Sequence, residues 1–249
     1  MRAIILAAGL GSRMKEHTAY KPKCLLEFGD KTLLQKQLDC FASNGIKDVH
    51  LVRGYLGEKI EYEGITYHQN PDFRENNILN SLFYAESALE GSIIISYSDI
   101  LFDGEVVAEL LKSDYDISIL VDTAWRKHYF GRNDHPLEEA EKVIFDARSN
   151  VIMIGKNVGR DDDIHGEFIG MMKLSPKGSQ ILKQNFHRAK SLYWDKPFQR
   201  APIFQKAYLT DMIQEMVDQG ISINCVIIEG GWKEIDTIED YERALGDWK

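Results

Sequence analysis

Cysteine and proline are scarce in this chain, and no apolar stretch is long enough to cross a membrane. Its 249 residues include three cysteines and six prolines. Three cysteines that lie far apart in the sequence fit neither a disulfide framework nor the spacing of zinc ligands, so we expect reduced thiols. The first apolar run, AIILAAG, is too short for a signal peptide or a membrane span. These absences predict a cytoplasmic protein with no membrane partner.

An excess of basic residues is also absent. The formal net charge is −9 and no basic stripe runs along the chain, which argues against a nucleic-acid polymer as a partner. The first 23 residues are the exception, because they carry five cationic side chains against the single acid Glu16. The five are Arg2, Arg13, Lys15, Lys21 and Lys23. This local excess predicts a binding site for a small polyanion.

Linkers, low-complexity segments and internal repeats are missing as well. The composition, with 44% hydrophobic and 28% charged residues, is that of an ordinary globular protein. We therefore predict one domain over residues 1–249, in which a segment at about 122–205 forms a mixed-sheet insertion. The oligomeric state is left open, with a homodimer as one reasonable assembly.

Strand and helix patterns alternate along the chain. Short apolar runs typical of buried strands occupy 2–8, 47–54, 92–99 and 116–122, and further strands are expected within 141–155, 165–175 and 221–231. Helical apolar spacing occupies 31–45, 77–89, 104–113, 210–220 and 237–245, and another helix begins at Ser175. This alternation predicts an α/β fold with a Rossmann-like, mixed but mostly parallel central sheet and helices on both faces.

Glycines that follow the first strand predict a phosphate-binding loop. The stretch LAAGLGSRMKEHTAYKPK (6–23) places Gly9 and Gly11 at the strand's end, where backbone N–H groups can approach phosphate closely. The G-x-x-x-x-G-K-[ST] pattern of a P-loop is not present. A dinucleotide fingerprint fails because Met14 occupies the position of its third glycine. A tight turn whose cations are merely solvated is the alternative that these residues leave open.

The string L-A-A-G-x-G-x-R-M, followed ten residues after Arg13 by Lys23, resembles the signature of the nucleotidyltransferases that join an NTP to a sugar phosphate or another small phosphate. The resemblance implies a nucleotide-diphospho-sugar transferase-like fold. It also implies that Arg13 and Lys23 are catalytic and neutralise the triphosphate, with Lys23 nearest the α-phosphate. The nucleotide would be bound by Leu6, Ala7, Ala8, Gly9, Gly11 and Ser12.

Two aspartates are candidate ligands for Mg²⁺, which proteins hold by one or two carboxylates together with phosphate oxygens. Asp99 follows a buried run, at the end of a strand where open parallel sheets bind ligands. Its segment YSDILF is similar to the family's G-D-x-x-F metal-binding segment, although Ser98 stands where many members have glycine. Asp236, in GGWKEIDTIEDY, resembles the W-x-x-I/V-D-T segment that supplies the other carboxylate. The alternative for both is helix capping or a turn.

The segment ENNILNSLFYA (75–85) is similar to the N-x-x-S-L-x-x-A segment of the cytidylyltransferase branch, which includes choline-phosphate and phosphonate-pathway enzymes. This resemblance implies that Asn77 and Ser81 contact a pyrimidine and that Gly54 and Tyr55 lie near the base. A simple helix cap is the alternative for Asn77.

The same resemblance directs Glu167, within the 122–205 insertion, at the acceptor. Tyr129 and Trp232 are further acceptor-binding candidates because they are aromatic, and Trp232 lies beside Asp236. A carboxylate at Glu167 would suit an ammonium or a hydroxyl group. An aromatic box for a quaternary ammonium would use Trp125, Tyr129, Trp194 and Trp232. The alternative is that these aromatic side chains belong to the core.

The sequence therefore predicts a Mg²⁺-dependent cytidylyltransferase. It would transfer CMP from CTP to 2-aminoethylphosphonate, 2-hydroxyethylphosphonate or phosphocholine and release pyrophosphate. A general base is not required, because a phosphate or phosphonate acceptor is already ionised. One alternative is a sugar-1-phosphate uridylyl- or thymidylyltransferase, and another is a non-catalytic nucleotide-sensing subunit on the same fold.

Overall fold

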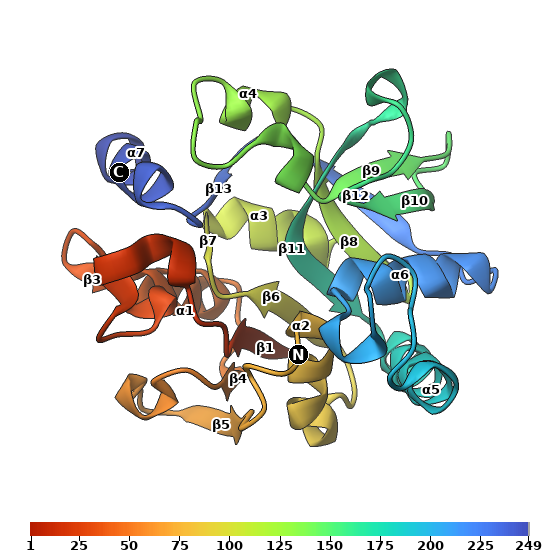
Figure 1. Ribbon diagram of the computed structural model, residues 1–249, viewed down its shortest axis with the longest axis horizontal. Coiled ribbons are helices and arrows are strands. Elements are labelled where there is room, and N and C mark those ends of the chain that lie inside the picture. Colours follow the sequence, from red (N-terminus) through yellow and green to blue (C-terminus); the bar gives the residue numbers. More distant parts are fainter. Residues whose placement is uncertain (249) are drawn as a thin grey trace.

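A nine-stranded β-sheet forms the centre of the computed structural model, which describes residues 1–248 (Figure 1). Its strands are β1 (Arg2–Ala7), β4 (Asp48–Arg53), β5 (Ile65–Gln69), β6 (Ile93–Tyr97), β8 (Ile117–Asp122), β9 (Lys142–Phe145), β10 (Val151–Gly155), β11 (Gly166–Leu174) and β12 (Asn224–Ile228). Two small sheets pair β2 (Glu27–Phe28) with β3 (Lys31–Thr32), and β7 (Ile100–Phe102) with β13 (Trp232–Glu234). The α-helices are α1 (Leu33–Ser43), α2 (Ile78–Leu82), α3 (Gly104–Leu111), α4 (Arg126–Tyr129), α5 (Pro176–Tyr193), α6 (Leu209–Asp218) and α7 (Ile238–Asp247).

The large sheet is mixed, and seven of its nine strands run in the same direction. Strands β6, β1, β4 and β5 are parallel neighbours, while β11 lies antiparallel to β6, β8 and β9. The predicted fold class is therefore confirmed. Because β11 belongs to the 122–205 segment and pairs directly with β6, we propose that this segment folds with the rest of the chain as one domain.

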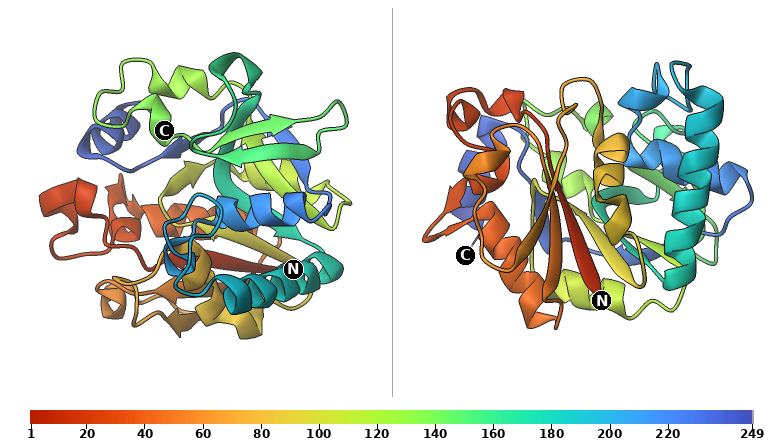
Figure 2. Two further views of the ribbon diagram at one scale, coloured as in Figure 1. Left: turned by 45° about the vertical axis from the view of Figure 1, so that its right-hand side comes forward. Right: turned by 90° about the horizontal axis from the view of Figure 1, so that it is seen from below.

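Helices cover both faces of the sheet, and Figure 2 shows α1 and α5 on opposite sides. The alternation of side chains along β1 explains this arrangement. Ile4 and Leu6 belong to the core that includes side chains of α2, α5 and α6, whereas Ile5 and Ala7 belong to the core that includes those of α1 and α3. The strand is apolar from Ala3 to Ala7 and is thus buried on both sides over that stretch, as its sequence predicts.

Side-chain caps start several helices where the sequence predicts them. Thr32 accepts a hydrogen bond from the Gln35 backbone N–H at 3.0 Å and begins α1. Ser175 begins α5 in the same way, and Thr237 begins α7. Each cap satisfies a backbone donor that the helix itself leaves free. Among residues 1–248, no helix combines the length and the apolar character needed to cross a membrane.

The structure differs from the sequence prediction in several elements. Strands β5, β7 and β13 were not predicted, and the predicted helix at 77–89 leaves α geometry after Leu82 and continues as 3₁₀ turns. Helix α6 is capped at Tyr208 rather than Thr210. A threonine at the start of the helical pattern at 210–220 predicts an N-cap at Thr210, but its hydroxyl donates to Glu141 at 2.9 Å, which is a contact with a distant part of the chain.

Candidate active site

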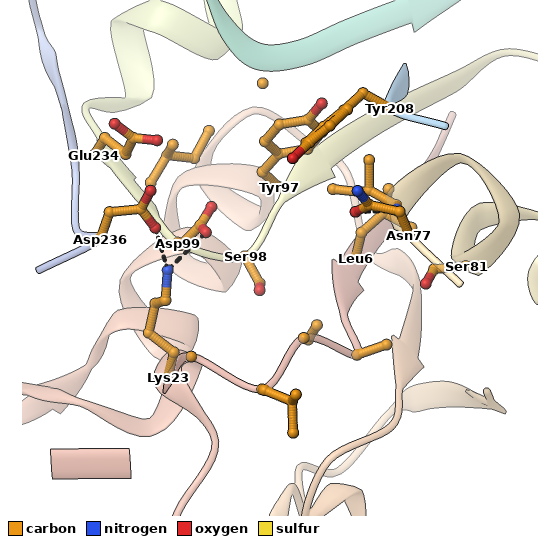
Figure 3. A pocket seen from close by; sticks show the side chains of 18 of the residues that line it. Leu6, Lys23, Asn77, Ser81, Tyr97, Ser98, Asp99, Tyr208, Glu234 and Asp236 are labelled. Atoms are coloured by element: carbon orange, nitrogen blue, oxygen red, sulfur yellow. Dashed lines mark hydrogen bonds and ion pairs between the residues drawn. The ribbon is translucent and has the colours of Figure 1, made fainter. Parts of the chain in front are cut away.

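A cavity of about 480 Å³ opens at the carboxyl ends of β1 and β6 (Figure 3), which is where open α/β sheets bind ligands. Most of the residues predicted from the sequence line it. They are Leu6, Ala7, Ala8, Gly9, Gly11, Ser12, Arg13, Lys23, Asn77, Ser81, Asp99, Glu167, Trp232 and Asp236. The exceptions are Gly54, Tyr55 and Tyr129, which lie behind residues of the lining.

Strand β1 delivers the glycine-rich loop to the wall of the cavity. Gly11 has a φ of 61°, a left-handed conformation that glycine adopts without strain. The Thr18 hydroxyl donates to the Gly11 carbonyl at 2.9 Å and holds the turn. The loop leads into 3₁₀ turns at Ser12–Thr18 rather than a long α-helix. Backbone N–H groups and side-chain cations, rather than a long helix dipole, would therefore face a bound phosphate.

Gly54 and Tyr55 support this loop from behind. A Cβ atom at Gly54 would lie 2.7 Å from the Ala8 carbonyl oxygen and 2.8 Å from the Phe73 Cβ, so a side chain does not fit between them. The Tyr55 backbone N–H donates to the Ala8 carbonyl at 3.2 Å, and its hydroxyl donates to the Thr18 carbonyl at 3.2 Å. Gly54 and Tyr55 therefore contact the backbone of the loop and do not themselves line the cavity.

Asn77 and Ser81 lie at the end of the cavity away from Asp236 (Figure 3). The Asn77 Oδ1 accepts from the Ile78 backbone N–H at 2.8 Å and caps α2. The Ser81 hydroxyl accepts from the Asn70 Nδ2 at 2.8 Å. Asn77 therefore caps a helix and lines the cavity at once, so the two alternatives drawn from the sequence are compatible. Both side chains are held in fixed positions, which a base-reading pair requires.

Lys23 is the centre of the charged part of the site. Its Nζ donates to the Asp99 Oδ2 at 2.9 Å and also to the Asp236 Oδ1, as the dashed lines in Figure 3 show. Arg13 binds the Asp236 Oδ2 at 2.5 Å. Burial by itself would raise the pKa of Asp236, but Lys23 and Arg13 hold that pKa well below its ordinary value. Burial acts to lower the pKa of Lys23, but Asp99 and Asp236 raise it above its usual range. The two aspartates therefore converge on a single cation.

Backbone pairing brings these two aspartates together from distant parts of the chain. The Ile235 N–H donates to the Asp99 carbonyl at 2.8 Å, next to the antiparallel pairing of β13 with β7. The Asp240 Oδ2 accepts from the backbone N–H groups of Asp236 at 3.1 Å and of Thr237 at 2.8 Å. The start of α7 thus fixes the backbone of Asp236 while its side chain faces the cavity.

Glu167 is buried at the end of the cavity formed by β11. Its side chain accepts a hydrogen bond from the Tyr129 hydroxyl at 2.6 Å through Oε1. Its other oxygen, Oε2, is buried without a partner. Burial raises the pKa of Glu167 to about 8, although the Tyr129 hydrogen bond and Arg132 act to lower it. Tyr129 therefore holds Glu167 from behind instead of lining the cavity itself.

The aromatic box that the sequence suggested is not formed. Trp232 lines the cavity, but its indole N–H donates to the buried Asp122 Oδ2 at 2.8 Å. Trp125 is 1% exposed within the core, and Trp194 is 45% exposed beside Phe204. Trp125 packs on Tyr129 with ring centroids 5.8 Å apart, and of the four aromatic residues of the suggested box only Trp232 lines the cavity.

Several lining residues were missed from the sequence, and two of them had a usable signal. Glu234 precedes Asp236 by two residues, and Tyr97 precedes Asp99 by two. Extended backbone places alternate side chains on one face, so each pair could have been predicted to share a face. All four residues line the cavity.

His135 and Glu141 were missed because the segment after β8 is irregular and carries no periodic pattern. His135 is 2% exposed, and burial together with Arg132 lowers its pKa to about 4. Burial raises the pKa of Glu141 to about 7, while the Thr210 hydroxyl donates to it at 2.9 Å. The cavity therefore ends in a group of buried acids that are partly protonated near neutral pH.

This fold, with a glycine loop at the end of β1 facing two convergent aspartates, defines a nucleotidyltransferase. Residues 3–155 match the model of the MobA-like NTP transferase domain, and the chain belongs to that family. It is 29% identical over 256 residues to the CTP:phosphoglutamine cytidylyltransferase of Campylobacter jejuni, across 98% of this chain and 99% of that relative. It is also 25% identical over 205 residues to the 2-aminoethylphosphonate cytidylyltransferase of Lancefieldella rimae, across 78% of this chain and 77% of the relative.

A solved structure of the CTP:phosphocholine cytidylyltransferase from Streptococcus pneumoniae superposes on this chain with a TM-score of 0.73. The match covers 100% of this chain and 99% of the other at 19% sequence identity, so it shows the shared fold. The sequence relatives place the chain in the cytidylyltransferase branch, as the sequence motifs predict.

Proposed function

We propose that this protein is a Mg²⁺-dependent cytidylyltransferase that transfers CMP from CTP to a small phosphate or phosphonate carrying an ammonium group. The observation that carries this proposal is the contact of Lys23 with both Asp99 and Asp236 beside the glycine loop. An anionic acceptor must approach an anionic donor in this reaction, so the main barrier is electrostatic, and clustered cations address it directly.

In the proposed reaction an acceptor oxygen attacks the α-phosphorus of CTP. The new bond joins that oxygen to phosphorus, the α–β phosphoanhydride bond breaks, and pyrophosphate leaves with its electron pair. The attacking oxygen is already ionised, so no side chain has to remove a proton. Lys23 and Arg13 would exchange their aspartate partners for triphosphate oxygens and neutralise the charge that the leaving group carries.

The residues of the chain fit a magnesium ion. Two carboxylate oxygens, Asp99 Oδ2 and Asp236 Oδ1, contact the same Lys23 ammonium, so they are close enough to share one cation. Mg²⁺ is commonly held by one or two carboxylates together with phosphate oxygens and water. When bound, the ion would supply Lewis-acid stabilisation to the reacting phosphate.

The acceptor end of the cavity favours a group that donates hydrogen bonds. The buried Glu167 Oε2 has no partner, and an N–H donor would satisfy it. A primary ammonium provides such donors, whereas the trimethylammonium of phosphocholine provides none. Without an aromatic box, the site therefore supports 2-aminoethylphosphonate-like acceptors better than phosphocholine. A hydroxyl, as in 2-hydroxyethylphosphonate, could donate to Glu167 but would bring no positive charge to the buried acids.

Pyrophosphate release tests this proposal. We expect turnover with CTP in preference to UTP, dTTP and ATP, and with 2-aminoethylphosphonate in preference to phosphocholine and glucose 1-phosphate. Replacing Lys23 with Met should reduce kcat by about 10²–10³-fold. The matched control is Lys31→Met, which removes an exposed ion pair with Asp39 and should leave kcat unchanged. Preference for UTP or dTTP with a hexose 1-phosphate would instead support a sugar nucleotidyltransferase, and absence of turnover with every pair would overturn the catalytic proposal.

A further inference from the structure

The two carboxylate oxygens of Asp236 face different groups. Oδ1 binds the Lys23 ammonium, which also binds Asp99. Oδ2 lies 2.5 Å from Arg13 and 3.6 Å from the His135 Nδ1. A carboxylate whose two oxygens face different directions can bridge two cations. The proposed magnesium site uses only the Oδ1 of Asp236, which faces Asp99.

His135 is the unexplained group on the other side of Asp236. Its side chain is 2% exposed, and its Nδ1 has no hydrogen-bond partner. Its Nε2 lies 3.5 Å from the Glu234 Oε2, which is beyond the length of a good hydrogen bond. A buried polar atom without a partner requires an explanation, and both ring nitrogens face carboxylates.

One ligand atom from each of His135, Glu234 and Asp236 can be chosen so that all three lie within 4.8 Å of one another. Ligands at about 2.1 Å from one ion are separated by roughly 3 to 4.3 Å, so only small side-chain movements would bring these three atoms onto one ion. We propose that His135, Glu234 and Asp236 form a second cation site, which binds a first-row divalent transition ion such as Mn²⁺. A nitrogen ligand beside two carboxylates suits such ions, whereas the all-oxygen pair of Asp99 and Asp236 suits Mg²⁺.

Two arginines compete with an ion at this second site. Arg13 binds the Asp236 Oδ2, and the Arg132 Nη2 lies 3.2 Å from the Glu234 Oε2. Arg13 belongs to the triphosphate-facing loop, so a bound nucleotide would draw its guanidinium away and free the Asp236 Oδ2 for the ion. The second ion would then lie toward the acceptor and neutralise its phosphate oxygens, as in two-metal sites. Only this role rests on the proposed function, because the binding site itself requires no reaction.

The test is Mn²⁺ binding to the metal-stripped full-length protein, without nucleotide or acceptor. Electron paramagnetic resonance titration measures affinity and stoichiometry, and pulsed measurements detect coupling between Mn²⁺ and an imidazole ¹⁴N nucleus. We expect ¹⁴N coupling in the wild type and in Asp99→Asn, and its loss in His135→Asn. Glu234→Gln should weaken this binding, and Arg13→Met should tighten it by about tenfold because a competing charged hydrogen bond is removed.

The matched control is His128→Asn, because His128 contacts the buried Asp122 at 2.9 Å and lies outside the proposed ligand set. Its ¹⁴N coupling should equal that of the wild type.

Absence of Mn²⁺ binding or of ¹⁴N coupling in the wild type, or coupling that survives in His135→Asn, would overturn the proposal. If His135→Asn does not fold, the Arg13→Met and Glu234→Gln affinities decide the matter, and no change in either counts against the site. Each of these results is independent of pyrophosphate release, so failure of this site and failure of the proposed function are separable.

Discussion

Replacement of Lys23 by Met should destabilise the protein at neutral pH as well as lower kcat. The Lys23 and Asp236 side chains are 12% and 6% exposed, and Asp99 is 28% exposed. Removing one partner of a buried ion pair costs about 3–5 kcal/mol. Arg13 still binds Asp236 in the variant, and Asp99 is partly hydrated. We therefore expect a loss at the lower end of that range, about 3 kcal/mol of unfolding free energy at pH 7.

The pH dependence of this loss follows from the pKa of Asp236. In the wild type the pKa of Asp236 lies well below its ordinary value. The charged form therefore stabilises the protein above the pKa of the unfolded state, which is about 3.9. This stabilisation is lost as the pH falls through the lower pKa of the folded state. Without Lys23, burial raises the pKa of Asp236 relative to the wild type, and the variant takes up a proton at a higher pH. The difference in stability should therefore shrink as the pH is lowered from 7 to 4.

Urea denaturation followed by circular dichroism at pH 7, 5.5 and 4 measures this difference. Mg²⁺ at millimolar concentration should raise the midpoint of the variant more than that of the wild type, because the ion can take the place of the missing ammonium between Asp99 and Asp236. A loss below about 1 kcal/mol at pH 7 would show that Lys23 does not neutralise buried acids. A loss that is equal at pH 7 and pH 4 would show that Asp236 is not the group involved.

Two further predictions concern the walls of the cavity. Gly54→Ala should lower stability by about 1–3 kcal/mol and raise the KM for CTP, because the new Cβ would lie 2.7 Å from the Ala8 carbonyl oxygen. Thermal melts measure the loss of stability. The control is Gly246→Ala, whose Cβ would meet nothing within 4 Å. The pKa of Glu167 is raised to about 8, so Glu167 is mostly protonated at pH 7, and affinity for an ammonium acceptor should increase between pH 6.5 and 8.5. Tyr129→Phe removes a hydrogen bond that lowers the pKa of Glu167, so the increase in acceptor affinity should move to higher pH. The KM for the acceptor, measured from pH 6.5 to 8.5, tests this. An unchanged pH profile would contradict the assignment of this titration to Glu167.

Local motifs were sufficient to predict several residues that line the cavity. The glycine loop, Lys23 and the two aspartates each lie in a short segment whose chemistry can be read from neighbouring residues. The glycine loop and Asp99 follow β1 and β6, which are short apolar runs, so the burial of these two strands was also predictable. The alternation of residues along β13 could in addition have identified Glu234.

The side of the cavity that contains His135 and Glu141 was less predictable because long-range packing creates it. His135 and Glu141 lie in the irregular segment after β8, and they reach the cavity only because Arg132 binds Asp240 of α7 and Thr210 of α6 binds Glu141. The tryptophans were misassigned for the same reason. No local pattern distinguishes a ring that lines a cavity from one that fills the core, because that depends on partners elsewhere in the chain.

The pairing of β13 with β7 also has a consequence for how the protein acquires activity during refolding. Lys23 and Asp236 are separated by 213 positions in the sequence, and Asp236 reaches Lys23 only after the C-terminal segment docks on β7. Contacts between such distant segments form slowly, since a long loop must close before they gain any energy. Nucleotide turnover should therefore recover only after most of the secondary structure has formed, because the pairing of β13 with β7 completes the charged part of the site.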